Sequence, residues 1–142
     1  MAITEQVYAC IEGMFGAQMN LDANAAMSFM ADTHCIWNVQ AGDLSDPTIW
    51  KAGPFVCRSE MNDGMAKQKS YEVQFKYLHT DIWEAPDSSK RTAVVVIEET
   101  GKVIFSDGAI REWNEVVNLW ALAEIAGTCK ITGSMHHIGE SA

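Results

Sequence analysis

The stretch YEVQFKYLHTDIWE, residues 71–84, decides the fold class because the chain changes there from helical to strand-like patterning. It is rich in aromatic residues and is followed by the turn sequence Pro86-Asp87-Ser88-Ser89, so we expect a long strand over Tyr71–Glu84. Further strands are expected at Thr92–Glu98, Ala109–Leu122 and Lys130–Ile138. Turns should separate them at Thr100–Lys102, Ser106–Gly108 and Ala126–Gly127.

The residues before Tyr71 favour helices. A first helix, capped by Thr4, has one apolar face at helical spacing: Val7, Tyr8, Ile11, Met14 and Phe15. Two shorter helices follow, one with Ala26, Met27, Phe29 and Met30, the other beginning at Ser59 with Met61 and Met65. A strand at Thr33–Val39 and a loop from Gly42 to Pro54 lie between them. Helices first and strands afterwards predict an α+β fold, with a curved antiparallel or mixed sheet packed against the helices around an apolar pocket.

Composition narrows the class of function. The chain of 142 residues corresponds to a single domain, residues 1–142. Its net charge of −9 argues against nucleic-acid binding and against docking on an anionic membrane, because both favour basic surfaces. No apolar run is long enough to span a membrane, and residues 1–16 have no basic segment typical of a signal peptide. We therefore expect a cytoplasmic protein.

Neither a metal nor a cofactor is expected. The four cysteines, Cys10, Cys35, Cys57 and Cys129, are far apart and form no CxxC pair, so they predict buried apolar residues instead of a metal site or a disulfide framework. His136 and His137 cannot share an ion, since adjacent strand residues point to opposite faces. The sequence also contains no nucleotide- or phosphate-binding loop.

Two predicted strands are apolar on both faces. Thr92–Ile97 and most of Val116–Leu122 do not alternate, whereas an antiparallel strand with one solvated face should. The helices would cover one face. We expect a second copy of the chain to cover the other, in a homodimer formed through the sheet. Trp37 and Trp113 are predicted to face that interface. A central strand inside a larger barrel is the alternative.

Several phrases of the sequence resemble one known superfamily. A short helix leads into Met30-Ala31-Asp32-Thr33-His34-Cys35-Ile36-Trp37-Asn38-Val39, and a loop ending in Gly53-Pro54-Phe55 leads into Arg58-Ser59-Glu60-Met61. The closing stretch Val117–Leu122, a glycine loop and Lys130-Ile131 follow in the same order. This arrangement resembles the nuclear transport factor 2-like superfamily, in its SnoaL-like and ketosteroid isomerase-like branch. The resemblance implies a cone-shaped α+β barrel with a deep pocket, commonly assembled as a dimer.

The catalytic residues of that superfamily do not carry over. The resemblance places the isomerases' general base at Asn38, their helix tyrosine at Met14, and their pocket aspartate at Asn118. An amide cannot accept a proton at neutral pH, so the isomerases' own acid–base pair is missing from these positions.

Strand alternation predicts which other residues line the pocket. With Asn38 inward, His34 and Ile36 are inward as well; with Asn118 inward, so are Asn114, Val116 and Trp120. On the last strand, Ser134, His136 and Ile138 are placed inward. The expected substrate-binding set is Met14, Phe15, Ile36, Asn38, Glu60, Val116, Asn118, Trp120 and Ile138.

The expected catalytic candidates are His34, His136 and Asp81. An imidazole titrates near neutrality and is suited to proton transfer. Asp81 shares a face of the long strand with His79 and Tyr77 and could orient an imidazole, although a solvated strand end is the competing interpretation. Each histidine could instead be a hydrogen-bonded core residue, and Glu60 could simply complement the dipole of its helix.

Three classes of function remain open from the sequence. The first is an isomerase, cyclase, dehydratase or hydrolase that acts on a small hydrophobic metabolite without a cofactor. The second is a non-catalytic module that binds such a ligand. The third is a dimeric interaction protein in which the pocket has no role.

Overall fold

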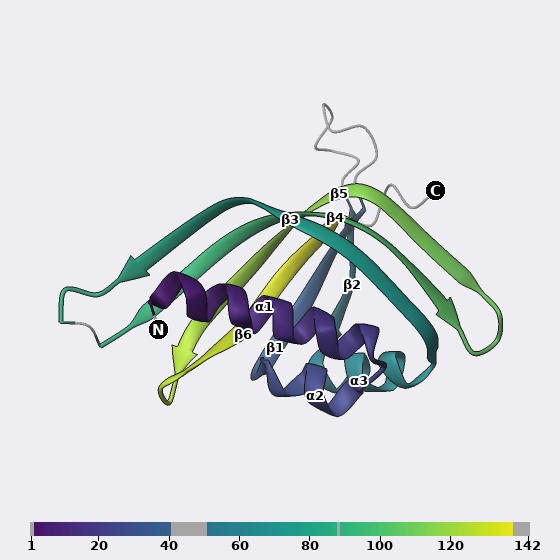
Figure 1. Cartoon of the computed structure of the whole chain (residues 1–142), viewed down its shortest axis with the longest axis horizontal. Helices are drawn as coiled ribbons and strands as arrows, with labels where there is room; N and C mark the ends of the chain where they lie inside the picture. The colour runs from purple at the N-terminus through teal and green to yellow at the C-terminus, as the bar shows by residue number, and fades with distance from the viewer. Residues whose placement is uncertain (1, 41–50, 88, 138–142) are drawn as a thin grey trace.

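The structure, a computed structural model, describes residues 2–40, 51–87 and 89–137. Its elements follow in the order α1 (Ile3–Met19), α2 (Ala23–Ser28), β1 (Met30–Gln40), β2 (Lys51–Cys57), α3 (Arg58–Ala66), β3 (Gln68–Glu84), β4 (Arg91–Phe105), β5 (Ile110–Ile125) and β6 (Thr128–His137). The sheet arches over α1, while α2 and α3 lie together near one end of that helix (Figure 1). The expected α+β class is confirmed.

The six strands of the described residues belong to one mixed sheet in the order β2-β1-β6-β5-β4-β3. β1 and β6 run parallel, and every other neighbouring pair is antiparallel. The sheet is open, since β2 and β3 form its two edges. The long strands β3, β4 and β5 bend around α1, so the sheet has a concave inner face toward the helix and a convex outer face away from it (Figure 1).

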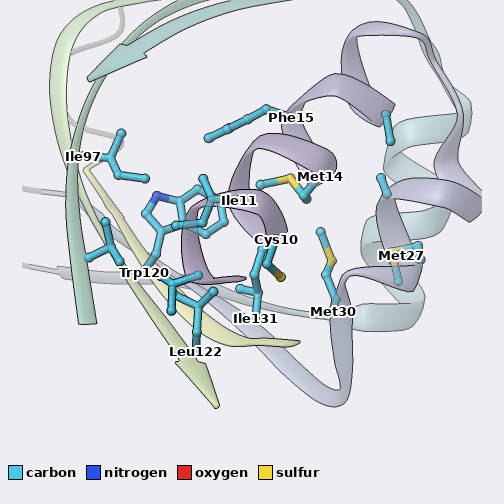
Figure 2. Packing of buried hydrophobic residues seen from close by; sticks show 14 of the residues in the cluster. Cys10, Ile11, Met14, Phe15, Met27, Met30, Ile97, Trp120, Leu122 and Ile131 are labelled. Carbon is cyan, nitrogen blue, oxygen red and sulfur yellow. The ribbon is translucent and has the colours of Figure 1, made fainter. Parts of the chain in front are cut away.

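The core lies between α1 and the inner face. The apolar face of α1 is buried as its spacing predicts, with Val7, Ile11, Met14 and Phe15 each no more than 1% exposed. These side chains meet Ile97, Trp120, Leu122 and Ile131 of the sheet (Figure 2). Burial of each large apolar side chain contributes about 1.5–3 kcal/mol, so this contact is the main force that holds helix and sheet together.

Three expected boundaries are corrected. β4 continues through Thr100–Lys102, where a turn was expected, with a shift of register between Glu99 and Gly101. Gly101 is required there because a Cβ would lie 2.3 Å from Cζ2 of Trp113. β2 occupies Lys51–Cys57, so the expected loop ends before Pro54, and its position at a sheet edge explains how a proline is tolerated. Helix α1 begins two residues earlier than expected, with Ala2 instead of Thr4 at the N-cap.

Irregular pairing also exchanges faces along β3 and β5. On β3 the register shifts between Tyr77 and His79, so Tyr77 packs toward α1 whereas His79 and Asp81 are exposed on the outer face. On β5, Glu115 has a positive φ of 51°. Trp113, expected on the outer face, instead packs against Tyr71 with ring centroids 6.0 Å apart. Asn114, expected inward, is exposed and accepts a hydrogen bond from Thr100.

Candidate functional site

A buried carboxyl group lies on the inner face of β4. Val95, Ile97 and Glu99 alternate along this strand toward the helix, and Glu99 is only 3% exposed. Asn118 of β5, also buried, donates a hydrogen bond from Nδ2 to Oε2 of Glu99. Trp120, two residues further along the same face of β5, also interacts with this carboxyl group and favours its charged form. Two strands therefore hold one acidic side chain in a fixed position inside the protein.

The surroundings of Glu99 change its acid–base behaviour. Burial raises the pKa of its carboxyl group from the usual 4.5 to about 7, and the interactions with Asn118 and Trp120 offset part of that rise. A group with this pKa can both donate and accept a proton near neutral pH. Burial, with a smaller contribution from the charge of Glu99, also raises the pKa of the Tyr71 hydroxyl, so Tyr71 stays a neutral phenol.

Aromatic side chains surround this polar group. Phe75 is the cross-strand neighbour of Glu99. Phe15 of α1 packs against Phe75, with ring centroids 4.7 Å apart, and meets the Trp120 ring edge-on, with ring centroids 5.4 Å apart. The ring of Tyr77 lies next to that of Phe75, with centroids 5.7 Å apart. Aromatic walls with a few convergent polar groups are typical of sites for small, largely apolar molecules.

Ser134 adds a second polar atom to this face. Its residue pairs directly with Trp120 across β5 and β6, and it is 7% exposed. Within the described residues, its buried Oγ has no hydrogen-bond partner. Because buried hydroxyl groups nearly always have a partner, this atom is suited to receive a water molecule or a polar group of a ligand.

His34 is buried but lies away from Glu99. It is 1% exposed, and its Nδ1 donates to the carbonyl oxygen of Ile131 over 3.1 Å. The histidine is on β1, which β6 and β5 separate from β4. The structure therefore does not bring His34 together with the Glu99 group, and its hydrogen bond joins β1 to β6.

The other expected site residues fall into two groups. Met14, Phe15, Val116, Asn118 and Trp120 are all buried, and the last two contact Glu99. Ile36, Asn38, Glu60 and His136 lie in β1, α3 and β6, but their side chains, and the whole of Ile138, are outside the described residues. The backbone register still pairs Asn38 with His136 and Ile36 with Ser134. Because β6 is the neighbour of β5, these positions continue, across the sheet, the cross-strand rows that contain Asn118 and Trp120.

Asp81 is separated from the interior. It forms an ion pair with His79 at 3.0 Å, and the two side chains are 77% and 61% exposed. Both project from the outer face of β3, so the expected grouping with Tyr77 is wrong. The register shift after Tyr77 is the physical reason, because it reverses the alternation on which that expectation was based.

Glu99 was missed from the sequence. The strand was expected to end at Glu98 and to turn at Thr100, which placed Glu99 in a connection. The signal that could have found it is the alternation of Ala93, Val95 and Ile97, which continues onto Glu99 and makes it the polar member of a buried face.

Two negative findings apply to the described part of the chain. It contains no cluster of three or more histidine, cysteine or acidic residues able to hold a metal ion. None of its helices combines the length and apolar character needed to cross a bilayer.

Comparisons with known proteins identify the fold. No protein-family model matches the sequence. No curated protein matches it either. Solved structures do match. A ketosteroid isomerase-like protein from Erwinia carotovora atroseptica is 13% identical, with a TM-score of 0.62 over 92% of both chains. A nuclear transport factor 2-like protein from Cytophaga hutchinsonii is 14% identical, with a TM-score of 0.63 over 96% of this chain and 98% of that one.

A third solved structure also matches the fold. It is described as a proposed beta subunit of an aromatic-ring-hydroxylating dioxygenase from Novosphingobium aromaticivorans, and it is 9% identical with a TM-score of 0.65. The match covers 94% of this chain and 86% of that one. At such low identity the similarity concerns the fold alone. The chain has the nuclear transport factor 2-like fold, as the order of its sequence motifs predicted.

Proposed function

We propose that this protein binds a small, largely apolar molecule beside Glu99 on the inner face of the sheet, and that Glu99 exchanges a proton with it. The observation that carries the proposal is the buried Glu99 carboxyl group, held by Asn118 among aromatic side chains. A buried acid costs stability at neutral pH, and such a cost is typical of functional sites. The cavity itself, expected to be deep and apolar, is part of this proposal.

The reaction that needs least from the site is an isomerisation. Glu99 as a carboxylate would take a proton from a carbon or hydroxyl group of the ligand and return it to another atom of the same molecule. No net oxidation occurs and no cofactor is required. Asn118 and Trp120 would orient the carboxyl group, while the Ser134 hydroxyl would bind a polar atom of the ligand. Cyclisation and dehydration use the same proton transfer.

Glu99 replaces His34 as the first candidate for proton transfer, since the Nδ1 of His34 is already bonded to the Ile131 carbonyl group. His136 remains a proposed second group, because its backbone lies beside Asn38 in the row that extends from Asn118. Non-catalytic binding is the alternative. It is favoured by the amides at positions 38 and 118, where the resemblance places carboxylates.

Deuterium exchange tests this proposal. A library of small apolar ketones, enones and phenols is screened by thermal shift, and compounds that bind are incubated with protein in D2O. Deuterium should enter the bound molecule at a rate that Glu99→Gln lowers at least 100-fold, whereas Glu98→Gln should leave the rate unchanged. If the ligand binds without deuterium uptake, the non-catalytic alternative holds. If Glu99→Gln exchanges as fast as wild type, Glu99 is not the proton carrier.

We also propose that the protein is a cytoplasmic homodimer formed through the outer face of the sheet. Apolar side chains continue across three adjacent strands of that face, namely Val94, Val117, Leu119 and Met135, each between 37% and 47% exposed. Leu119 pairs directly with Val96 on one side and with Met135 on the other, so the apolar strip is continuous. A continuous apolar strip of this kind fits a second copy of itself.

A further inference from the structure

Two thiol groups meet where α1 crosses β6. Cys10 is buried on α1, and its Sγ lies 3.4 Å from the carbonyl oxygen of Cys129, at the start of β6. Cys129 is half-buried and packs against the edge of the core. Figure 2 shows Cys10 pointing from α1 toward Ile131, which is on the same strand as Cys129. The two cysteines are 119 positions apart in the sequence, so only the fold brings them together.

The two thiols are chemically unequal. The interaction between the two side chains, together with burial, raises the pKa of Cys10, and the same interaction lowers the pKa of Cys129. Burial opposes ionisation of both groups, and the cross-strand neighbour Glu124 opposes it at Cys129. Cys129 is therefore the thiol that ionises first, with the Cys10 thiol beside it. A thiolate with an adjacent thiol is the arrangement found in pairs that oxidise to a disulfide.

Solvent can reach Cys129 from one side. A small, partly open cleft lies between the beginning of α1 and the ends of β4, β5 and β6, and Cys129 is among the residues that line it. Apolar residues such as Val7 and Leu122 line it together with the charged residues Arg91 and Glu124. A small oxidant can thus reach Cys129 from the cleft, whereas Cys10 is 5% exposed and does not line it.

We propose that Cys10 and Cys129 form a reversible disulfide that is made in response to peroxide. The Cys129 thiolate attacks the O–O bond of hydrogen peroxide, which yields a sulfenic acid and, after proton transfer, water. The Cys10 sulfur then attacks the Cys129 sulfur and releases a second water, so two thiols are oxidised as one peroxide is reduced. A dithiol reductant of the thioredoxin class returns both thiols. The bond would fasten α1, which covers the inner face, to the hairpin of β5 and β6.

The cross-link is measured on the whole chain. After treatment with hydrogen peroxide, peptide mapping without reductant should find Cys10 joined to Cys129, with a mass lower by two hydrogens. A loop of this length should raise the melting temperature by about 10 °C, and dithiothreitol should reverse the rise. The proposal is overturned if the joined peptide is absent or if the melting temperature does not rise with it.

Matched variants test the order of the two steps. The backbone register places Cys35 opposite Cys57, so both are changed to serine to remove a competing pair. In that background, Cys10→Ser should leave a Cys129 sulfenic acid that dimedone traps, whereas Cys129→Ser should leave Cys10 at least tenfold less labelled. Equal labelling of the two single cysteines would contradict the assigned order. If the serine background does not fold, peptide mapping of the wild-type chain distinguishes the possible pairs.

Discussion

Glu98 and Glu99 are neighbours in the sequence but lie on opposite faces of the sheet. Glu98 lies on the outer face and forms an ion pair with Lys76 at 3.3 Å, on the adjacent strand β3. Glu99 lies on the inner face, 3% exposed, and is bonded to Asn118. The two residues have identical side chains, yet Glu98 forms a partly solvated ion pair, whereas Glu99 is a buried acid with a pKa of about 7. Position relative to the sheet, and not residue type, determines the chemistry.

The same contrast applies to the apolar residues of the two faces. On the inner face, Leu122 and Trp120 are 2% and 3% exposed beneath α1. On the outer face of the same strand, Leu119 and Val117 are 39% and 47% exposed. The inner residues stabilise the fold of one chain, whereas the outer residues are available to a partner.

The largest effect is expected from the core. Leu122→Ala should lower the free energy of unfolding by about 3 kcal/mol, since it removes buried methyl groups and leaves a cavity. Leu119→Ala, on the same strand, should cost less than about 1 kcal/mol, because its side chain is partly exposed. Urea denaturation of dilute protein measures both. Equal losses would show that the two faces are buried alike.

Glu99→Gln should change how stability depends on pH. The folded protein holds the Glu99 proton more tightly than the unfolded chain does, so this group makes stability fall as pH rises from about 4.5 through 7. The corresponding difference is roughly 3 kcal/mol. At pH 4 the variant should match wild type, and at pH 8 it should be the more stable. Glu98→Gln, measured in parallel, should not show this gain. A similar gain in stability would mean that Glu99 does not differ from Glu98 in the pKa of its carboxyl group.

Leu119→Asp should weaken the proposed dimer. A charge placed in the apolar strip should cost about 2 kcal/mol of association free energy, which is roughly a thirtyfold rise in Kd. Sedimentation velocity over a range of concentrations measures the change, with Lys76→Ala at the periphery as the control. If Leu119→Asp leaves the Kd of the dimer unchanged, the interface does not include this strip. If the wild-type protein is a monomer even at high concentration, the proposed dimer does not form.

The smallest effect is expected at the exposed ion pair. His79→Ala and Asp81→Asn should each change the free energy of unfolding by less than about 1 kcal/mol, because exposed pairs contribute little. Neither should alter ligand binding at the inner face. A loss of ligand binding in Asp81→Asn would restore Asp81 as a functional residue and contradict its separation from the site.

Much of the fold could be predicted because it depends on regular periodicity. The helical spacing of Val7, Ile11 and Met14 gave α1, and strand alternation placed Val116, Asn118 and Trp120 inward, where the structure has them. The irregular positions could not be predicted in this way. The register shifts at Tyr77 and Glu99 each add a residue to one strand, which reverses every face assigned beyond them.

The candidate site was predicted only in part for the same reason. Asn118 and Trp120 were identified as members of the inner face, but the acid that they hold was not. Glu99 was excluded because Thr100-Gly101-Lys102 has the composition of a turn. Gly101 serves a different purpose in the structure: it leaves room for the Trp113 ring, which approaches from the adjacent strand. Only tertiary packing reveals that role.

The most direct test of this account is the titration of Glu99 itself. Carbon-13 NMR of protein labelled at the glutamate carboxyl groups follows each resonance with pH, and Glu99→Gln assigns the one that disappears. The account predicts a midpoint near 7 for Glu99, because burial raises its pKa to about 7. A Glu99 midpoint near 4.5 would mean that this carboxyl group is solvated, and would contradict its assignment as the proton carrier of the inner face.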